Sequence, residues 1–308
     1  MDATEIADSG QPHGASRRAR LLGRLAVVLA ALMWSLSGAL AKHPAFDVWP
    51  EECRGTLLAF WRAMFAAMIL VPTIRRPRWH PLLLPLAACF SLMSVSYMTA
   101  MSRTTAANAI WLQATAPWWV FLFSVLLFRE PIVRRDLIPL GFGAIGVGVI
   151  LGYEAGGESA VGVAYGLAAG ITYAGVVVCM RRLRAENSPW LVALNHGVAM
   201  LVLAPFALSL GHWPTGLQWL LLAALGILQM ALPYLLFIRA LRSISSQEAV
   251  AIGMLEPILI PFWAYLVSGE VPRPWTVAGA VLILVGLTLR YVVWEGMAAA
   301  ARRGNRSP

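Results

Sequence analysis

Apolar residues occur in ten long runs, and short groups of charged and turn-forming residues separate the runs. Each run contains about 17 to 25 residues, the length that an α-helix needs to cross about 30 Å of hydrocarbon. Because backbone polar groups inside a bilayer must be satisfied within the protein, the pattern predicts an all-α integral membrane protein with ten transmembrane helices. The predicted spans are 25–42, 56–74, 82–101, 105–128 and 136–153 in the first half, and 161–180, 189–209, 217–238, 245–267 and 275–293 in the second half.

The two halves of the chain resemble each other. Residues 97–146 align with residues 237–286 without a gap, at a constant offset of 140, and Pro117 meets Pro257 in this alignment. Most of the other aligned pairs are apolar in both halves. Five spans per half is an odd number, so the second half enters the membrane from the opposite side. The sequence therefore predicts two inverted five-helix repeats, which are common in secondary transporters.

Composition and charge agree with a membrane protein. Hydrophobic residues make up 59% of the chain and charged residues 13%, about half the roughly 25% that is usual in soluble domains. The net charge of +9 does not indicate a nucleic-acid partner, because the basic residues form short groups between spans instead of following one face. Most arginines fall on one predicted side, at 17–24, 75–78, 129–135, 181–184, 242 and 302–306, whereas Lys42, Arg54, Arg103 and Arg273 fall on the other. By the positive-inside rule, both termini are predicted to be cytoplasmic.

The ends of the chain are predicted to lie outside the repeats. We expect a disordered cytoplasmic N-terminus at 1–21, the first five-helix repeat at 22–153, the second at 161–293, and a basic cytoplasmic tail at 294–308 that contacts anionic lipid. The arginines at 17–24, followed by apolar residues, are also typical of a secretory signal. The alignment of residues 30–34 with residues 169–173 favours the first helix of the repeat instead.

Residues typical of metal centres and catalytic sites are not grouped in this sequence. Cys53, Cys89 and Cys179 lie in different segments, and their spacing predicts neither a disulfide nor a zinc site. We find no phosphate-binding glycine loop, nucleophile elbow or cluster of carboxylates and histidines. The sequence therefore predicts no metal, no cofactor, no ATP hydrolysis and no enzymatic activity.

Several short motifs occur in an order that is typical of one family. They are Ala31-Leu32-Met33-Trp34-Ser35, Phe60-Trp61-Arg62, Thr105-Ala106-Ala107, Pro117 ahead of Phe128-Arg129-Glu130, Leu255-Glu256-Pro257 and Gly269-Glu270. With these motifs, the chain resembles the drug/metabolite transporter superfamily over about residues 22–293, and in particular its ten-helix EamA-type exporters. The resemblance implies two inverted five-helix halves, a central cavity lined mainly by helices one, three, four, six, eight and nine, and export of small metabolites across an inner membrane. Tyr173 departs from the family pattern, which often has Trp in the sixth helix.

Carboxylates within the ninth span are candidates for substrate binding or coupling, since a polar residue in hydrocarbon is costly unless it faces a cavity or a partner. Glu256 lies near the middle of this span, directly before Pro257, which lacks a backbone donor and loosens the helix. Its carboxylate either binds a substrate ammonium group, carries a coupling proton, or forms a structural pair. Glu248 lies two turns earlier on about the same face, as a second carboxylate or as a solvated charge at the helix end.

Further candidate binding residues are amides and aromatic rings within the spans. Repeat symmetry places helix four near the central axis, and its amides either contact substrate or form interhelical hydrogen bonds. Aromatic rings can stack on planar groups or hold an organic cation, and packing is the alternative for each. Together with Glu256, the predicted substrate-binding set is Trp34, Tyr97, Asn108, Trp111, Gln113, Tyr173, Tyr234 and Trp263.

Arg62 in helix two and His196 in helix seven occupy corresponding places in the two halves. They are candidates for coupling or charge recognition, together with Glu248 and Glu256. Arg62 either recognises a substrate carboxylate, forms a structural ion pair or extends to the membrane surface. His196 either takes part in coupling or packs as a satisfied histidine.

Other positions predict structural roles. Glu130 and Glu270 end helices four and nine, and each is expected to anchor the exposed backbone donors of the following helix. Glycines recur at every fourth position in helices six and five, which predicts close contacts between helix backbones. They are Gly162, Gly166 and Gly170 in helix six, and Gly148 and Gly152 in helix five.

The combined prediction is a secondary transporter that exports small organic metabolites, such as amino acids or related amphiphilic compounds, across the inner membrane by alternating access. Proton coupling and facilitated diffusion both stay open, and so do a monomer and a homodimer. The alternative within transport is a carrier of nucleotide-sugar or lipid-linked substrates, which requires more basic cavity residues than Arg62 alone. A membrane-embedded enzyme or a non-transporting scaffold fits less well. The expected partners are the substrate and membrane lipids, and no nucleic acid.

Overall fold

The computed structural model describes residues 16–74, 77–129, 134–154, 156–157, 159–183, 186 and 188–294, and every regular element in these ranges is helical. The first half contains α1 (Arg17–Ser35), α2 (Ser37–Ala41), η1 (Pro44–Phe46), α3 (Glu51–Leu70), η2 (Val71–Thr73), α4 (Leu83–Arg103), α5 (Ala106–Gln113), α6 (Ala116–Phe128) and α7 (Arg134–Glu154). The second half contains α8 (Ala160–Arg182), α9 (Ser188–Ser209), α10 (Leu217–Gly226), η3 (Ile227–Ala231), α11 (Leu232–Ala240), α12 (Ser246–Gly253), α13 (Leu255–Ser268), α14 (Pro274–Thr288) and η4 (Leu289–Trp294).

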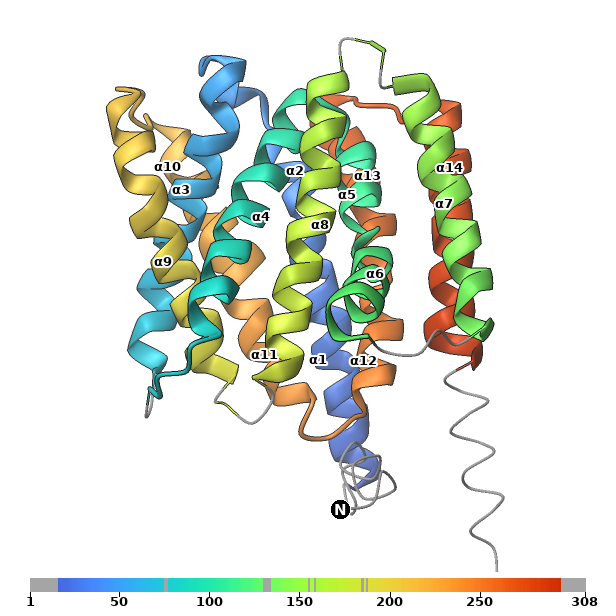
Figure 1. Cartoon of the computed structure of the whole chain (residues 1–308). Coiled ribbons are helices and arrows are strands. Elements are labelled where there is room, and N and C mark those ends of the chain that lie inside the picture. Colours follow the sequence, from blue (N-terminus) through green and yellow to red (C-terminus); the bar gives the residue numbers. More distant parts are fainter. Residues whose placement is uncertain are drawn as a thin grey trace, which may run out of the picture.

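The helices form ten membrane-crossing segments in two halves of opposite orientation. Nine helical stretches in the described ranges are long and apolar enough to span a membrane, and the tenth is α14, which η4 extends. The first half begins with α1 at the lower face in Figure 1, whereas the second half begins with α8 at the upper face. We call the face where α1 begins and α14 ends the terminal face, and the opposite one the distal face. The predicted fold, ten helices in two inverted repeats, is confirmed.

Two spans are broken in their middle, at positions that repeat between the halves. Span four breaks at Ala114 and Thr115, between α5 and α6, and span nine breaks at Met254, between α12 and α13. Pro117 and Pro257 follow these breaks and lack the N–H that a continuous helix would direct at the carbonyl four residues earlier. The prolines therefore account for half-helices whose ends meet near the centre of the bundle.

The outer ends of the same two spans also repeat at the offset of 140 residues. The Thr105 hydroxyl accepts a hydrogen bond from the backbone N–H three residues later (3.1 Å), and the Ser245 hydroxyl does the same (3.2 Å), so both are N-caps. At the other ends, Arg129 and Gly269 adopt left-handed backbone conformations, with φ of 53° and 68°. The repeat is thus present in the backbone conformation as well as in the sequence.

Glycines bring helices of the two halves close to each other. Not all of the glycines that were predicted to pack do so. A Cβ added at Gly162, Gly166 or Gly170 of α8 would lie between 2.5 and 2.9 Å from atoms of residues 103–115, which confirms the predicted contacts. The prediction for Gly148 and Gly152 was wrong, because both face open space in α7.

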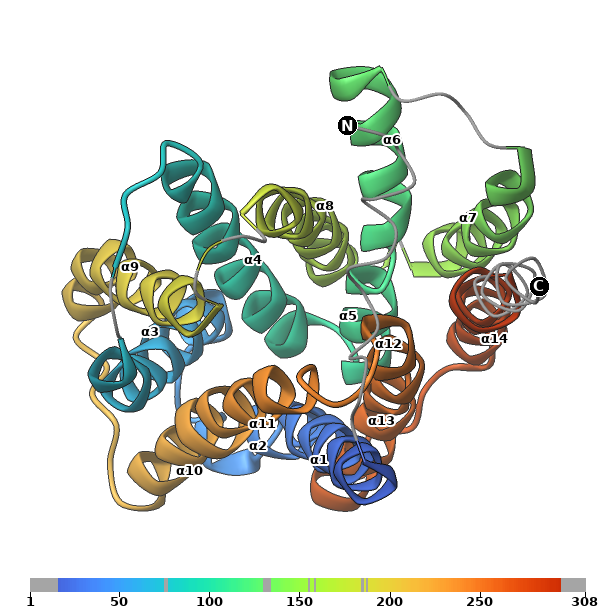
Figure 2. The ribbon, with the colours of Figure 1, turned by 90° about the horizontal axis from the view of Figure 1, so that it is seen from below.

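The face of α7 that carries Gly146 packs against α14 instead. A Cβ at Gly146 would lie 2.6 Å from the carbonyl oxygen of Gly279, and a Cβ at Gly279 would lie equally close to that of Gly146. Viewed along the bundle, α7 and α14 form a pair at its edge (Figure 2). The close contact of α7 therefore lies at Gly146, which was not among the glycines predicted to pack.

Candidate functional site

A cavity of about 460 Å³ lies at the centre of the bundle. Its wall contains side chains from spans one, three, four, six, eight and nine, as the family resemblance implies, and also Arg62 from span two and Leu287 from span ten. Val177, Phe237 and Val250 belong to the wall and lie close to the terminal-face ends of α8, α11 and α12. The cavity therefore occupies the middle of the bundle and the half that faces the terminal face.

Seven of the twelve candidate residues meet on the cavity wall. They are Trp34, Arg62, Tyr97, Gln113, Tyr173, Tyr234 and Glu256. They come from spans one, two, three, four, six, eight and nine, so residues far apart in the sequence converge on one space. The wall is mainly apolar and aromatic, with a few polar groups, which is the usual chemistry of a small-molecule site.

Glu256 is the acidic residue of this wall. It lies in the first turn of α13, directly after the break in span nine, where exposed backbone donors favour a carboxylate. It forms no hydrogen bond or ion pair with any described residue, and the carboxyl interacts electrostatically with Tyr97 and Tyr234. The break therefore presents to the cavity a carboxylate that has no counter-ion among the described residues.

Arg62 lies on the same wall but does not pair with Glu256. Its side chain is 1% exposed, and its Nη2 donates a hydrogen bond of 2.8 Å to the hydroxyl of Ser94 on α4. The guanidinium also interacts electrostatically with Tyr97 and Tyr234. The cavity thus has a cationic and an anionic group on its wall, with two tyrosines close to both.

Aromatic side chains surround the polar groups. The ring centroid of Trp34 lies 5.3 Å from that of Tyr234 and 5.4 Å from that of Phe237. The hydroxyl of Tyr97 shares a hydrogen bond of 3.2 Å with that of Ser37. These rings can hold an organic cation or pack against the apolar part of a substrate.

Gln229 is a wall residue that the sequence analysis did not include. Its side-chain nitrogen donates to the backbone carbonyl of Trp34 at 3.1 Å, and it lies in the π-helical turn η3. Such turns are frequent at functional sites. A polar side chain in the apolar span 217–238 was a usable signal, by the same reasoning that selected Gln113.

Three candidates from spans four and nine lie outside the cavity. Asn108 is fully buried, where its side chain donates to the Thr104 hydroxyl (3.0 Å) and accepts from the Thr276 hydroxyl (2.8 Å). Trp111 packs in the main hydrophobic core, and the Trp263 ring nitrogen donates to the hydroxyl of Ser35 at 2.8 Å. All three side chains contact neighbouring helices instead of lining the cavity. Such structural contacts were the alternative to substrate binding for each of them.

Glu248 and His196 also lie off the wall. Glu248 forms an ion pair with Arg24 near the terminal face, and the helix break at Met254 separates it from Glu256. Of the two carboxylates predicted to lie on about the same face, only Glu256 lies on the cavity wall. His196 is buried behind the wall, with its ring centroid 6.1 Å from that of Tyr234.

A group of polar contacts closes the distal face above the cavity. The ammonium of Lys42 lies 2.8 Å from a carboxylate oxygen of Glu270 and donates to the carbonyl of Thr104 at 2.6 Å. Glu270 also accepts a hydrogen bond of 2.6 Å from the backbone N–H of Ala106, at the start of α5. We call these contacts the distal clasp. Glu270 thus anchors a helix of the other repeat, and the predicted anchoring of the following helix was wrong; Glu130 lies outside the described residues.

Further contacts join the repeats at the same face. Glu154, at the end of α7, accepts a hydrogen bond of 2.9 Å from the ring nitrogen of Trp275 and another from the hydroxyl of Ser159. Together with the bond between Asn108 and Thr276, they tie α5, α7, α8 and α14 together.

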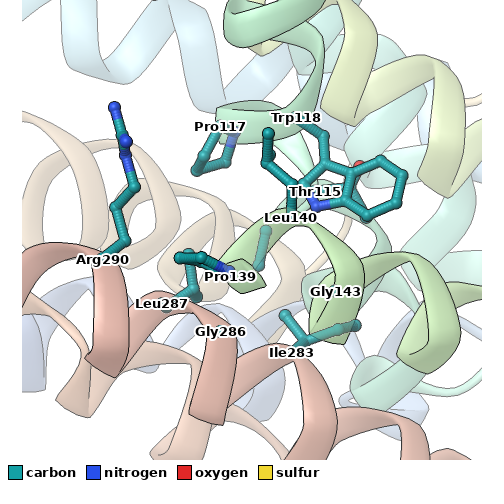
Figure 3. A pocket seen from close by; sticks show the side chains of 11 residues that line it. Thr115, Pro117, Trp118, Pro139, Leu140, Gly143, Ile283, Gly286, Leu287 and Arg290 are labelled. Carbon is teal, nitrogen blue, oxygen red and sulfur yellow. The ribbon is translucent and has the colours of Figure 1, made fainter. Parts of the chain in front are cut away.

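A second and smaller pocket lies between α6, α7 and α14 (Figure 3). Its wall is mostly apolar, with Trp118, Pro139 and Ile283 among its residues. Pro117 and Leu287 belong to the walls of both this pocket and the central cavity, so they form part of the partition between the two. The pocket has no carboxylate in its wall and is far less suited to an amine than the central cavity.

Comparisons with known proteins find relatives over nearly the whole repeat region. Residues 21–152 and residues 160–292 each match the model of the EamA-like transporter family. A protein named as an uncharacterized transporter of Archaeoglobus fulgidus is 28% identical over 272 residues, which cover 87% of this chain and 96% of that protein. The pseudopaline exporter CntI of Pseudomonas aeruginosa is 28% identical over 277 residues, 85% of this chain and 93% of that exporter. The threonine/homoserine exporter RhtA of Escherichia coli is 30% identical over 196 residues, 60% of this chain and 62% of that exporter.

The fold has a counterpart among solved structures. A crystal structure of another protein superposes with a TM-score of 0.61, covers 90% of this chain and 97% of that chain, and is 20% identical in sequence. At this identity the likeness concerns the fold alone.

Proposed function

We propose, from the premise that this chain belongs to the EamA-like transporter family, that it exports small organic metabolites, such as amino acids or related amphiphilic compounds, by alternating access. The family match covers both halves, so the chain is a multi-pass membrane transporter and not an enzyme. The names of two relatives, a pseudopaline exporter and a threonine/homoserine exporter, support export as the direction. We place the terminal face, which carries most of the arginines, in the cytoplasm.

The observation that carries this proposal is the carboxylate of Glu256, which faces an aromatic cavity and has no partner among the described residues. A charge in the middle of a membrane protein is costly and is usually retained for function. An organic ammonium group would supply the missing counter-ion, and Trp34 and Tyr234 would supply rings against which a cation is stable.

The asymmetry between the two faces supports alternating access. The cavity reaches toward the terminal face, whereas the distal clasp and the contacts of Glu154 close the distal face. Release on the distal side then requires these contacts to break while the terminal-face ends of the two halves close. The half-helices at the breaks in spans four and nine are suited to this movement, because their backbones already bend beside the cavity.

A carrier of nucleotide-sugar or lipid-linked substrates fits the cavity less well. Phosphate-bearing substrates require several cations, and Arg62 is the one Lys or Arg among the described wall residues.

The test is uptake of labelled amino acids and amines into proteoliposomes, with and without a pH gradient. We expect saturable uptake by the native protein and loss of most of it in Glu256→Gln, which keeps the shape and removes the charge. Glu248→Gln is the matched control, since Glu248 pairs with Arg24 away from the cavity, and it should retain uptake.

Each result of this test has a distinct meaning. Acceleration by the gradient that disappears in Glu256→Gln would assign proton coupling to this residue, and saturable uptake without such acceleration would indicate facilitated diffusion. Equal uptake by native protein and Glu256→Gln would contradict the role of Glu256. Uptake of nucleotide sugars in place of amines would favour the alternative substrate class.

A further inference from the structure

Arg62 is a buried cation without a counter-ion in the described chain. Its hydrogen bond to Ser94 uses Nη2, while Nε and Nη1 are buried and have no partner. Burying a charge without a compensating charge is strongly unfavourable. The arginine is nevertheless held in place at the cavity wall, 1% exposed, instead of extending to a membrane surface.

The polar groups on the neighbouring helices share this lack of partners. Both ring nitrogens of His196 are buried and form no hydrogen bond with any described residue, and neither do Oδ1 of Asn195 and Oε1 of Gln229. The His196 ring lies 4.8 Å from that of Phe90 and interacts electrostatically with Arg62. We call Arg62, Ser94 and His196 the arginine recess. Because nearly all buried polar groups in proteins have partners, the unpartnered atoms of Arg62 and His196 point to a polar group that reaches Arg62 from the cavity.

We propose that the arginine recess binds the carboxylate of the transported substrate and thereby selects zwitterions over simple amines. This inference rests on the proposed function, in which Glu256 binds the ammonium group. A carboxylate can accept a charge-assisted hydrogen bond from Nε or Nη1, the two nitrogens of the guanidinium that have no partner among the described residues. It would also supply the negative charge that the described residues around Arg62 lack.

The separation of Arg62 from Glu256 supports this reading. Both charged residues line the same cavity, together with Tyr97 and Tyr234. Opposite charges in a region of low dielectric attract strongly, yet they form no ion pair within 4.0 Å. Arg62 is held by Ser94 on α4, and Glu256 is fixed at the start of α13. Since the two opposite charges line one cavity and do not pair with each other, a molecule that carries one charge of each sign would supply a counter-ion to both.

The test compares three compounds that differ only at the carboxyl group: the best-transported amino acid of the uptake panel, its methyl ester and its decarboxylated amine. Inhibition of labelled uptake gives the apparent affinity for each. A hydrogen bond to a charged group is worth enough to change affinity by about tenfold to hundredfold. We therefore expect the native protein to prefer the amino acid over the ester by about that factor.

Variants of Arg62 decide whether this residue is responsible. In Arg62→Gln the preference for the amino acid over its ester should fall to about twofold or less, and Arg62→Lys should keep part of the preference. Arg54→Gln is the matched control on the same helix, because Arg54 pairs with Asp47 near the distal face, and it should keep the native preference. If Arg62→Gln fails to fold, the native comparison of acid and ester together with Arg62→Lys still decides the question.

Several outcomes would overturn the inference. Equal affinity of the native protein for acid, ester and amine would show that no carboxylate is recognised, while the proposed function stands. An unchanged preference in Arg62→Gln would mean that a residue other than Arg62 recognises the carboxylate. Dependence of amine uptake on chloride, tested by replacement with gluconate, together with no preference for the acid, would assign the recess to a free anion. Absence of uptake for every compound would defeat the proposed function and this inference with it.

Discussion

Replacement of Glu270 with Gln is expected to open the distal face of the bundle. The carboxylate of Glu270 holds two other segments, the ammonium of Lys42 at the end of α2 and the backbone N–H of Ala106 at the start of α5. The variant keeps an oxygen that can accept from Ala106 but removes the charge that both contacts use. The closed distal face is therefore destabilised, while the cavity wall is unchanged.

The size of the effect follows from the burial of the pair. Exposed ion pairs contribute about 0 to 1 kcal/mol, and breaking a buried pair costs about 3 to 5 kcal/mol. Lys42 and Glu270 are each 16% exposed, so we take about 2 kcal/mol for the pair. Weakening of the charge-assisted bond to Ala106 adds about 1 kcal/mol. A total of about 3 kcal/mol shifts the equilibrium toward an open distal face by roughly 100-fold.

The assay is the labelling rate of a single cysteine in the cavity. Cys53, Cys89 and Cys179 are first replaced, and Gln113→Cys on the cavity wall then reacts with a membrane-impermeant maleimide applied at the distal face. We expect much faster labelling in Glu270→Gln and native rates in Glu248→Gln, whose carboxylate pairs with Arg24 at the other face.

Two results would refute this reasoning. An unchanged rate of distal labelling in Glu270→Gln would mean that the clasp does not hold the distal face closed. Faster labelling from both faces would indicate general unfolding instead of opening at one face. A double-mutant cycle of Lys42→Met and Glu270→Gln separates the ion pair from the bond to Ala106. The coupling free energy between the two substitutions measures the ion pair, and the remaining effect of Glu270→Gln measures the bond to Ala106.

Two further predictions concern stability in detergent, measured by thermal unfolding. Arg129→Gly should stabilise the protein by about 1 kcal/mol, since Arg129 has a φ of 53° where the other repeat has Gly269; a lower melting temperature would contradict this. Gly146→Val should destabilise the protein by more than about 2 kcal/mol, because its Cβ would lie 2.6 Å from a backbone oxygen of α14. Gly148→Val, with open space around Gly148, should have a much smaller effect, and equal losses would reject the packing argument.

The fold was largely predictable because a bilayer leaves few alternatives. Long apolar runs in a membrane must form helices, and an odd number of spans per repeat inverts the second half. Pro257 also marked a place where the helix was expected to loosen, and the aligned Pro117 follows the corresponding break in span four. The division of span one at Leu36 was not predicted, because no proline marks it. The π-helical turn at Gln229 was not predicted either, although Pro233 follows it and lacks the N–H that a continuous helix would direct at the carbonyl of Gln229.

The candidate site was predicted in part, and the failures have a common cause. Trp34, Tyr234 and Glu256 do line the cavity, since a polar or aromatic residue near the middle of a central span has few other places to go. Asn108 and Trp263 satisfied the same criterion, but they hydrogen-bond to side chains on neighbouring helices. In a single sequence, a polar residue that faces a cavity cannot be distinguished from one that faces a polar side chain on a neighbouring helix.

The sequence by itself determined which segments cross the membrane, that the halves are inverted, and which residue types lie at mid-depth, because these follow from apolar length, parity and the cost of polar groups in hydrocarbon. Only the tertiary structure decided which of those polar groups are paired. It joined Glu270 to Lys42 and Ala106, and it placed Glu256 and Arg62 on one cavity wall without counter-ions in the described part of the chain. Pairing depends on how far each helix is rotated and how far apart the helices lie. Side-chain packing across the whole bundle sets both quantities, and the order of residues along the chain does not contain them.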